Sequence, residues 1–138
     1  MASLVLFEEF AEAVAEKVHN LGSDTLTVAL TDAAPDAATD AVLADITQIS
    51  YTNLGTRVIT TSSSAQTSGV YKLVLSDKTL AATGVVAQFR YVVIYNDTAS
   101  NDELIGYVDL GSEINMINGS NLILDFDGSA GVITITIS

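Results

Sequence analysis

The segment from Arg90 to Leu110 constrains the fold most, because it reads as two β-strands joined by a polar turn. Residues Arg90–Tyr95 are apolar, β-branched and aromatic, and strand character returns over Glu103–Leu110. The intervening Asn96–Asp102 stretch consists of Asn, Asp, Thr, Ala and Ser, which are mostly turn formers. This pattern predicts a long β-hairpin.

Shorter runs of the same kind predict further strands on both sides of this hairpin. From Thr25 onward, apolar and small polar residues alternate, which predicts a strand buried on one face only. The other expected strands are Arg57–Thr61, Val70–Leu75, and a second hairpin of Leu122–Phe126 and Val132–Ile137 around Asp127–Gly131. Between them, the Ser- and Thr-rich Thr61–Gly69 stretch is predicted to be an exposed turn. For Ala41–Ile49, a short helix and a packed loop both remain open.

The N-terminal segment Phe7–Asn20 has helical periodicity instead. Apolar side chains recur there at spacings of three and four, at Phe7, Phe10, Val14 and Val18. These four are expected to share one buried face of a helix. Ser3 is a candidate N-cap for this helix, and Gly22 a candidate stop signal.

One helix followed by short sequential strands predicts a mainly β protein. We expect an antiparallel β-sandwich, or a barrel-like variant, of about seven strands with one N-terminal α-helix. The 138 residues suit a single domain. The helix is expected at about residues 7–20 and the β-sandwich at about residues 25–138.

Charge and cysteine content exclude several classes of partner and site. Seventeen Asp and Glu face five Lys and Arg, for a formal net charge of -12. Nucleic acid and anionic membranes are therefore disfavoured as partners, because binding them relies on Lys and Arg.

No apolar run is long enough to span a bilayer, and the acidic start is not expected to be a signal peptide. The chain has no Cys, so disulfides and thiolate sites are excluded. Since 49% of the residues are hydrophobic, subunit contacts are expected.

The remaining candidate site residues favour structural interpretations over chemical ones. His19, the single histidine, is placed near the predicted helix end, where a cation is favoured. Asp125 and Asp127 match the start of a calcium loop, but Asp-Gly is also common hairpin-turn chemistry, and no Glu follows at loop position 12. The tyrosines in the predicted strands are expected to pack across strands. We therefore expect no catalytic, cofactor-binding or metal-binding residues, and no enzymatic activity.

Three segments together resemble a family of small tailed-bacteriophage virion proteins. They are LFEEFAEAVAEKVHNLGSDTLTVALTDAAPDAATDAVLADITQI, FRYVVIYNDTASNDELIGYVDLGS and LILDFDGSAGVITITIS. The second resembles that family's "aRYaViYddt…dpLiaYiDfG" pattern most specifically. The three occur in the family's order and cover most of the chain. The family often contains Trp, which this chain lacks, and the region Gly55–Ala82 lies outside the resemblance.

The resemblance implies a capsid decoration (cement) protein, made in the bacterial host cytoplasm and located on the outer capsid surface of the virion. Its implied partners are the major capsid protein and further copies of itself, as a homotrimer. A phage tail, neck or fibre protein and a soluble β-sandwich ligand-binding module are the alternatives. Acidic turns are the expected partner contacts, because turns project furthest from a sandwich. The candidate residues are Asp36, Asp40, Asp45, Asp97, Asp102 and Glu103.

Overall fold

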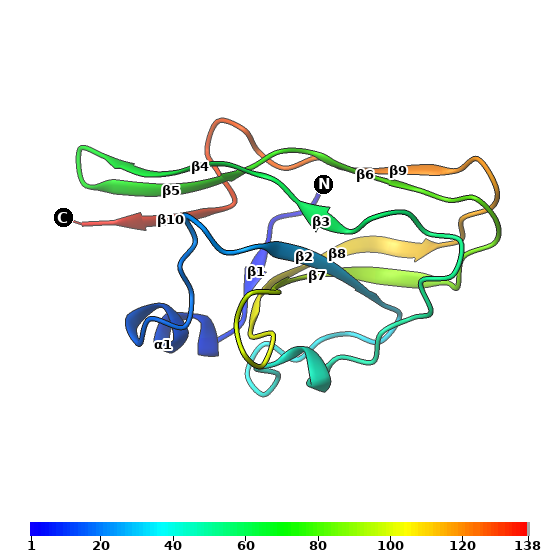
Figure 1. Ribbon diagram of the computed structural model, residues 1–138, viewed down its shortest axis with the longest axis horizontal. Coiled ribbons are helices and arrows are strands. Elements are labelled where there is room, and N and C mark those ends of the chain that lie inside the picture. Colours follow the sequence, from blue (N-terminus) through cyan, green and yellow to red (C-terminus); the bar gives the residue numbers. More distant parts are fainter. Residues whose placement is uncertain (138) are drawn as a thin grey trace.

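The computed structural model describes residues 1–137 and is mainly β (Figure 1). Its larger sheet has five antiparallel strands in the order β1-β8-β7-β2-β3. Their bounds are Val5–Leu6 (β1), Leu104–Ile114 (β8), Phe89–Asn96 (β7), Leu26–Thr31 (β2) and Val58–Ile59 (β3). Strands β7 and β8 are antiparallel neighbours, so the predicted long hairpin is confirmed.

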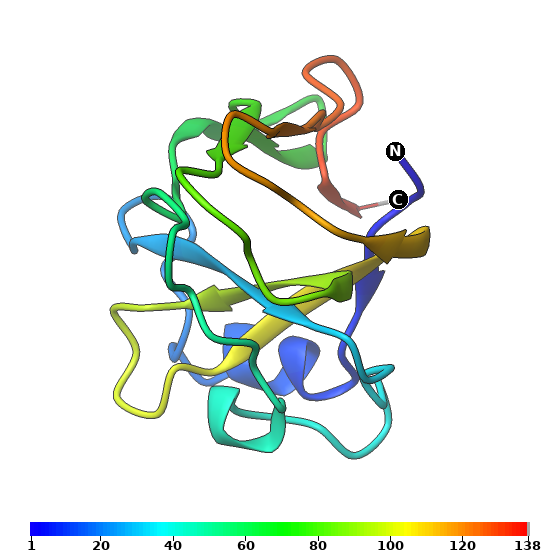
Figure 2. The same ribbon diagram turned by 90° about the vertical axis from the view of Figure 1, so that its right-hand side faces the viewer.

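A second layer of strands lies over one face of this sheet (Figure 2). It contains a three-stranded sheet of order β10-β5-β4 and the pair β6-β9. The bounds are Thr61–Thr67 (β4), Val70–Leu75 (β5), Lys78–Ala81 (β6), Asn121–Leu124 (β9) and Ile133–Thr136 (β10). The predicted sandwich-like, antiparallel architecture is confirmed, with more strands than the seven expected. The sheets formed by residues 1–137 stay open, so the barrel-like variant is wrong.

Both faces of the larger sheet are buried. On one face, Leu26, Val28 and Leu30 of β2 pack into the main core with residues of the second layer. On the other face, a smaller cluster covers the sheet with side chains from outside it, including Phe7 and Ile46. The prediction of a half-buried β2 is therefore wrong, because all six of its residues are buried.

The N-terminal helix is shorter than predicted. Helix α1 spans Glu9–Ala15, its N-cap is Glu8, and residues Val5–Leu6 before it pair with β8. The expected 7–20 span and the Ser3 cap are thus wrong. The helix ends early because Lys17 takes a positive φ of 67°. The expected apolar stripe is divided as well, since Phe7 lies in the smaller cluster and Phe10 in the main core.

Two predictions about the second layer are wrong. The Thr61–Gly69 stretch is strand β4 rather than a turn, and the turn itself is confined to Ser68 and Gly69, which both have positive φ. The segments around Asp127–Gly131 do not form a hairpin with each other. Strand β9 pairs with β6, and β10 pairs with β5. A turn signal shows where the chain bends but does not identify the next strand's partner.

Strands β4, β5 and β10 extend past the end of the larger sheet, and we call them the arm (Figure 1). At the opposite face of the larger sheet lie α1 and the loop after β2 (Figure 2). That loop contains a 3-10 turn at Leu43–Asp45, which decides between the two interpretations of Ala41–Ile49 in favour of a short helical turn.

Candidate functional site

The two acidic segments singled out in the sequence lie side by side. The N–H of Leu43 donates to the carbonyl of Asp102 at 3.0 Å, and the N–H of Leu104 donates to the carbonyl of Ala41 at 2.9 Å. Between these bonds, Val42 and Glu103 form an isolated antiparallel bridge. The loop after β2 is thereby fixed to the tip of the β7–β8 hairpin. We call this joined surface, from Asp36 to Asp45 and from Asp97 to Glu103, the acidic end.

Several carboxylates of the acidic end shape its loops. Asp36 Oδ1 accepts the N–H of Ala38 at 2.9 Å, and Asp40 Oδ2 accepts the N–H of Asp36 at 2.8 Å. Asp45 Oδ2 accepts the N–H groups of Ala41 and Val42, and these bonds lower the pKa of its carboxyl. These aspartates hold their own backbone and still carry charge at the surface.

The hairpin side of the acidic end is held differently. Asp97 Oδ2 accepts the hydroxyl of Thr27 at 3.2 Å. Asp102 has a positive φ of 53°, which turns the chain back into β8. Glu103 is half-buried, and its Oε1 accepts the side-chain amide of Asn101 at 3.3 Å. Glu103 Oε2 is buried without a hydrogen-bond partner, so this carboxylate projects less than a loop position suggests.

Helix α1 adds carboxylates to the same surface. The N–H of Glu8 donates to the carbonyl of Ala37 at 2.9 Å, which joins the helix start to the loop after β2. A shallow hollow of about 210 Å³ lies between α1 and the hairpin tip. Its acidic lining residues are Glu9, Glu12, Glu16 and Glu103. The sequence gave no sign that the carboxylates of α1 lie close to the hairpin tip.

Asn96 is a structural residue that the sequence did not single out. It is fully buried at the end of β7. Its Oδ1 accepts the N–H groups of Thr98 and Ala99, and its Nδ2 donates to Asp24 at 2.7 Å. The same amide nitrogen lies 3.0 Å from His19 Nδ1. Asn96 thus joins the hairpin tip to the segment that follows α1.

His19 is buried next to this amide. Because Asn96 Nδ2 is a donor, His19 Nδ1 accepts and the ring proton lies on Nε2, which has no hydrogen-bond partner. Burial lowers the pKa of His19 from 6.5, against the opposing influence of the nearby carboxylates of Glu103 and Asp24. The expectation of a cation favoured at a helix end is therefore wrong for His19. It lies past the end of α1 and its environment favours the neutral ring.

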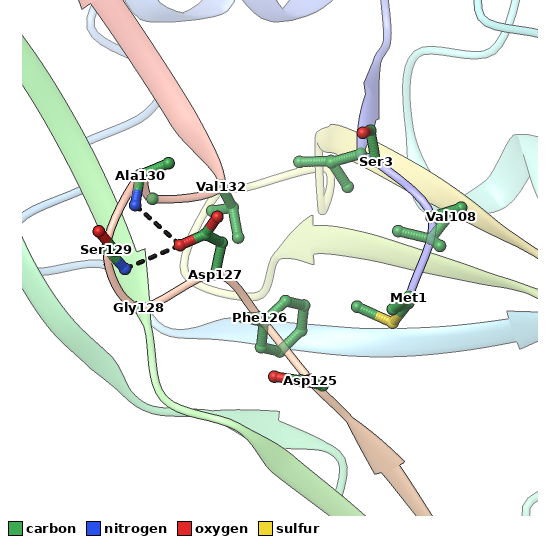
Figure 3. A pocket seen from close by; sticks show the side chains of 13 residues that line it. Met1, Ser3, Val108, Asp125, Phe126, Asp127, Gly128, Ser129, Ala130 and Val132 are labelled. Carbon is green, nitrogen blue, oxygen red and sulfur yellow. Dashed lines mark hydrogen bonds between the residues drawn. The ribbon is translucent and has the colours of Figure 1, made fainter.

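The Asp127 loop is built as a turn (Figure 3). Asp127 Oδ1 accepts the N–H groups of Ser129 and Ala130, each at 2.8 Å, and these bonds lower its pKa. The adjacent hollow of about 690 Å³ is lined by this loop and by residues 1–4. Asp127 is directed at its own backbone, which favours the turn interpretation over a calcium loop.

The tyrosines and the possible metal ligands are two further classes of candidate residue. Tyr91 and Tyr107 pack edge to face with ring centroids 6.4 Å apart, which confirms cross-strand packing for this pair. Within residues 1–137, no group of three or more His, Asp or Glu side chains is placed to hold a metal ion. No helix in the same range is long and apolar enough to cross a membrane.

Comparison of this chain with protein-family models, with curated proteins and with solved structures found no match.

Proposed function

We propose that this chain is a capsid decoration (cement) protein of a tailed bacteriophage, without catalytic activity. Its role is to bind the outer surface of the shell and stabilise neighbouring capsomers. The proposal is supported by the three sequence segments that resemble small phage virion proteins. The observation that carries it furthest is the acidic end, where two acidic segments distant in sequence are joined into one surface.

The acidic end suits a protein partner with a basic or mixed surface. With a formal charge of -12, the chain repels a strongly acidic face. Exposed ion pairs contribute little affinity each, so charge mainly steers the encounter and fixes the register. Apolar contacts supply most of the affinity. The major capsid protein is the partner in this proposal, and the chain occurs on it as a homotrimer.

Stabilisation in this proposal is passive. A protein that binds the assembled shell but not its dissociated subunits stabilises the shell by mass action. No residue has to move a proton or break a bond. Passive binding requires only a rigid docking surface. The backbone hydrogen bonds that join the loop after β2 to the hairpin tip supply that rigidity.

Mass spectrometry of purified parent particles, separated into heads and tails, tests the proposal. We expect the chain in the head fraction at high copy number. Occurrence in the tail fraction alone would assign it to the tail, neck or fibre alternative. Absence from both fractions would contradict a virion role and leave the ligand-binding module, which calorimetric titration with sugars or calcium then tests.

A further inference from the structure

Strand β10 has a free edge. In the order β10-β5-β4 it pairs with β5 alone among the described residues, and the β10–β5 register runs without a shift. Its residues Thr134, Ile135 and Thr136 are exposed, as is Ile137 just beyond it. Ile135 is 41% exposed and Ile137 75% exposed.

The N–H of Val132 donates to the carbonyl of Leu73 at 2.9 Å although Ile133 is the register partner of Leu73, so β10 begins at a bulge. Beyond it, over Ile133–Ile137, the edge lacks the features that usually protect a strand from pairing with another chain. All residues from Val132 to Ile137 are β-branched, and none is charged or Pro. Lys, Pro, bulges and inward-pointing charges are the common protective features of edge strands. The free edge of β4, on the other side of the same sheet, is less suited to pairing, because β4 is mainly Ser, Thr, Ala and Gln.

The backbone groups that face the free edge can be identified. The N–H of Ile137 donates to the carbonyl of Gly69 at 2.8 Å, on the β5 side. Hydrogen-bonding direction alternates along a strand, so Ile133 and Ile135 also face β5. The N–H and C=O groups of Thr134 and Thr136 therefore face outward.

The sequence of this edge is self-complementary. Ile133–Ile137 is ITITI and reads the same in both directions. In an antiparallel pair centred on Ile135, Thr134 of one copy lies opposite Thr136 of the other, and the two Ile135 residues lie opposite each other. The outward groups of both threonines are then paired, and the exposed Ile135 side chains cover one another.

Charge also favours a second copy here. Repulsion between copies is expected over most of a chain of net charge -12. By contrast, Gly128–Ile137 contains no charged residue, and Lys72 is the single charged side chain between Thr60 and Leu75. The edge itself is thus uncharged. In the hollow beside Ile135, the carboxylate of Asp24 is accompanied by the cation of Lys17.

We propose that two copies of this chain pair through the free edges of β10, antiparallel about a two-fold axis at Ile135. The pairing joins the three-stranded sheets of two arms into one six-stranded sheet. This two-fold contact is different from the contacts that form the proposed homotrimer. The inference concerns the free protein and does not rest on the proposed capsid role. The strand contact is small, so the dimer is expected to be weak and concentration-dependent.

Sedimentation equilibrium of the full chain tests the pairing. We expect the apparent mass to rise from 14.4 kDa toward twice that value with concentration. Thr134→Pro removes an outward N–H, which an edge strand tolerates, and should keep the mass at one copy. Thr134→Ser keeps the donor and should dimerise like the parent chain. Thr136→Lys leaves the backbone donors unchanged and places a charge on the edge, so it should also prevent dimerisation. It replaces Thr134→Pro in the test if the proline impairs folding.

Cysteine cross-linking tests the register. The chain has no Cys, so a single introduced thiol reports one position. Directly opposed residues of an antiparallel pair have Cβ atoms close enough for a disulfide. Ile135→Cys should therefore form a covalent dimer on oxidation. Ile123→Cys, on β9 and 61% exposed, is the matched control and should remain monomeric.

A chain that stays monomeric at all concentrations would overturn the proposal. So would an oligomer that Thr134→Pro and Thr136→Lys leave unchanged, or equal cross-linking of Ile135→Cys and Ile123→Cys.

Discussion

At the scale of single residues, polar side chains of this protein mostly hold the backbone of loops. Asp36, Asp40, Asp45 and Asp127 each accept N–H groups of nearby residues. Asn96 does the same for the hairpin tip and also contacts His19 and Asp24. The sequence placed these residues in or beside turns. It did not show which were buried, because burial depends on segments distant in the chain.

The lowered pKa of His19 predicts how folding stability depends on pH. In the unfolded chain the ring takes up a proton near pH 6.5, whereas in the folded protein protonation occurs at lower pH. Between these two values the unfolded state binds more protons, so stability falls as pH falls. We expect the free energy of unfolding, measured by urea titration, to decrease as the pH is lowered from 7.5 through 6.5.

The His19→Gln variant is the control for this effect. Gln cannot titrate but can still accept a hydrogen bond from Asn96. Its stability should be nearly independent of pH over the same interval, above the range in which carboxylates titrate. Equal pH dependence of the parent chain and His19→Gln would show that another group is responsible.

At the scale of elements, local pattern predicted the strands better than their partners. The β7–β8 hairpin was predictable because two apolar runs flank a short polar turn. Strand β4 was missed because its Ser- and Thr-rich sequence also suits a turn. The false second hairpin arose because β9 and β10 are close in sequence but pair with β6 and β5.

In the candidate site, too, the sequence predicted the separate segments better than the contact between them. Each acidic segment could be predicted as an exposed turn from its own sequence. Their junction could not, because the bridge of Val42 to Glu103 joins residues distant in the chain. Neither residue carries a local signal for that pairing.

The turn that leads into β10 provides a test at this scale. Gly131 has a φ of +79°, and a Cβ added there would lie 2.8 Å from the carbonyl oxygen of Leu73. Gly131→Ala should therefore destabilise the fold by about 1–3 kcal/mol, since both the backbone and β5 must adjust. Gly128→Ala, in the same loop, meets nothing within 4 Å and is the control. Thermal unfolding that is equally affected by both variants would contradict this account.

At the scale of the whole molecule, charge is unevenly distributed. Carboxylates of α1, the loop after β2 and the β7–β8 tip gather at the acidic end, while the arm carries Lys72 as its single charged side chain between Thr60 and Leu75. The two parts therefore suit different partners. A basic or mixed protein surface fits the acidic end, and an uncharged strand fits the arm.

This separation predicts how salt affects attachment to bare particles. Long-range attraction between the acidic end and a basic partner face is screened at high ionic strength, whereas apolar contacts in a formed complex are screened much less. Raising salt should therefore slow attachment more than it speeds release, as measured by association and dissociation rates on immobilised shells.

A fourfold variant tests whether the acidic end is responsible. It combines Asp36→Asn, Asp40→Asn, Asp97→Asn and Asp102→Asn, which keep an oxygen acceptor at each position. This variant should attach more slowly at low salt, and its attachment should depend less on salt. The control is Glu113→Gln with Asp125→Asn, compared with the double variant Asp36→Asn and Asp97→Asn. It removes two exposed carboxylates outside the acidic end and should leave attachment nearly unchanged. Attachment that is insensitive to salt and to the fourfold substitution would show that the charge serves solubility alone, and that docking uses another surface.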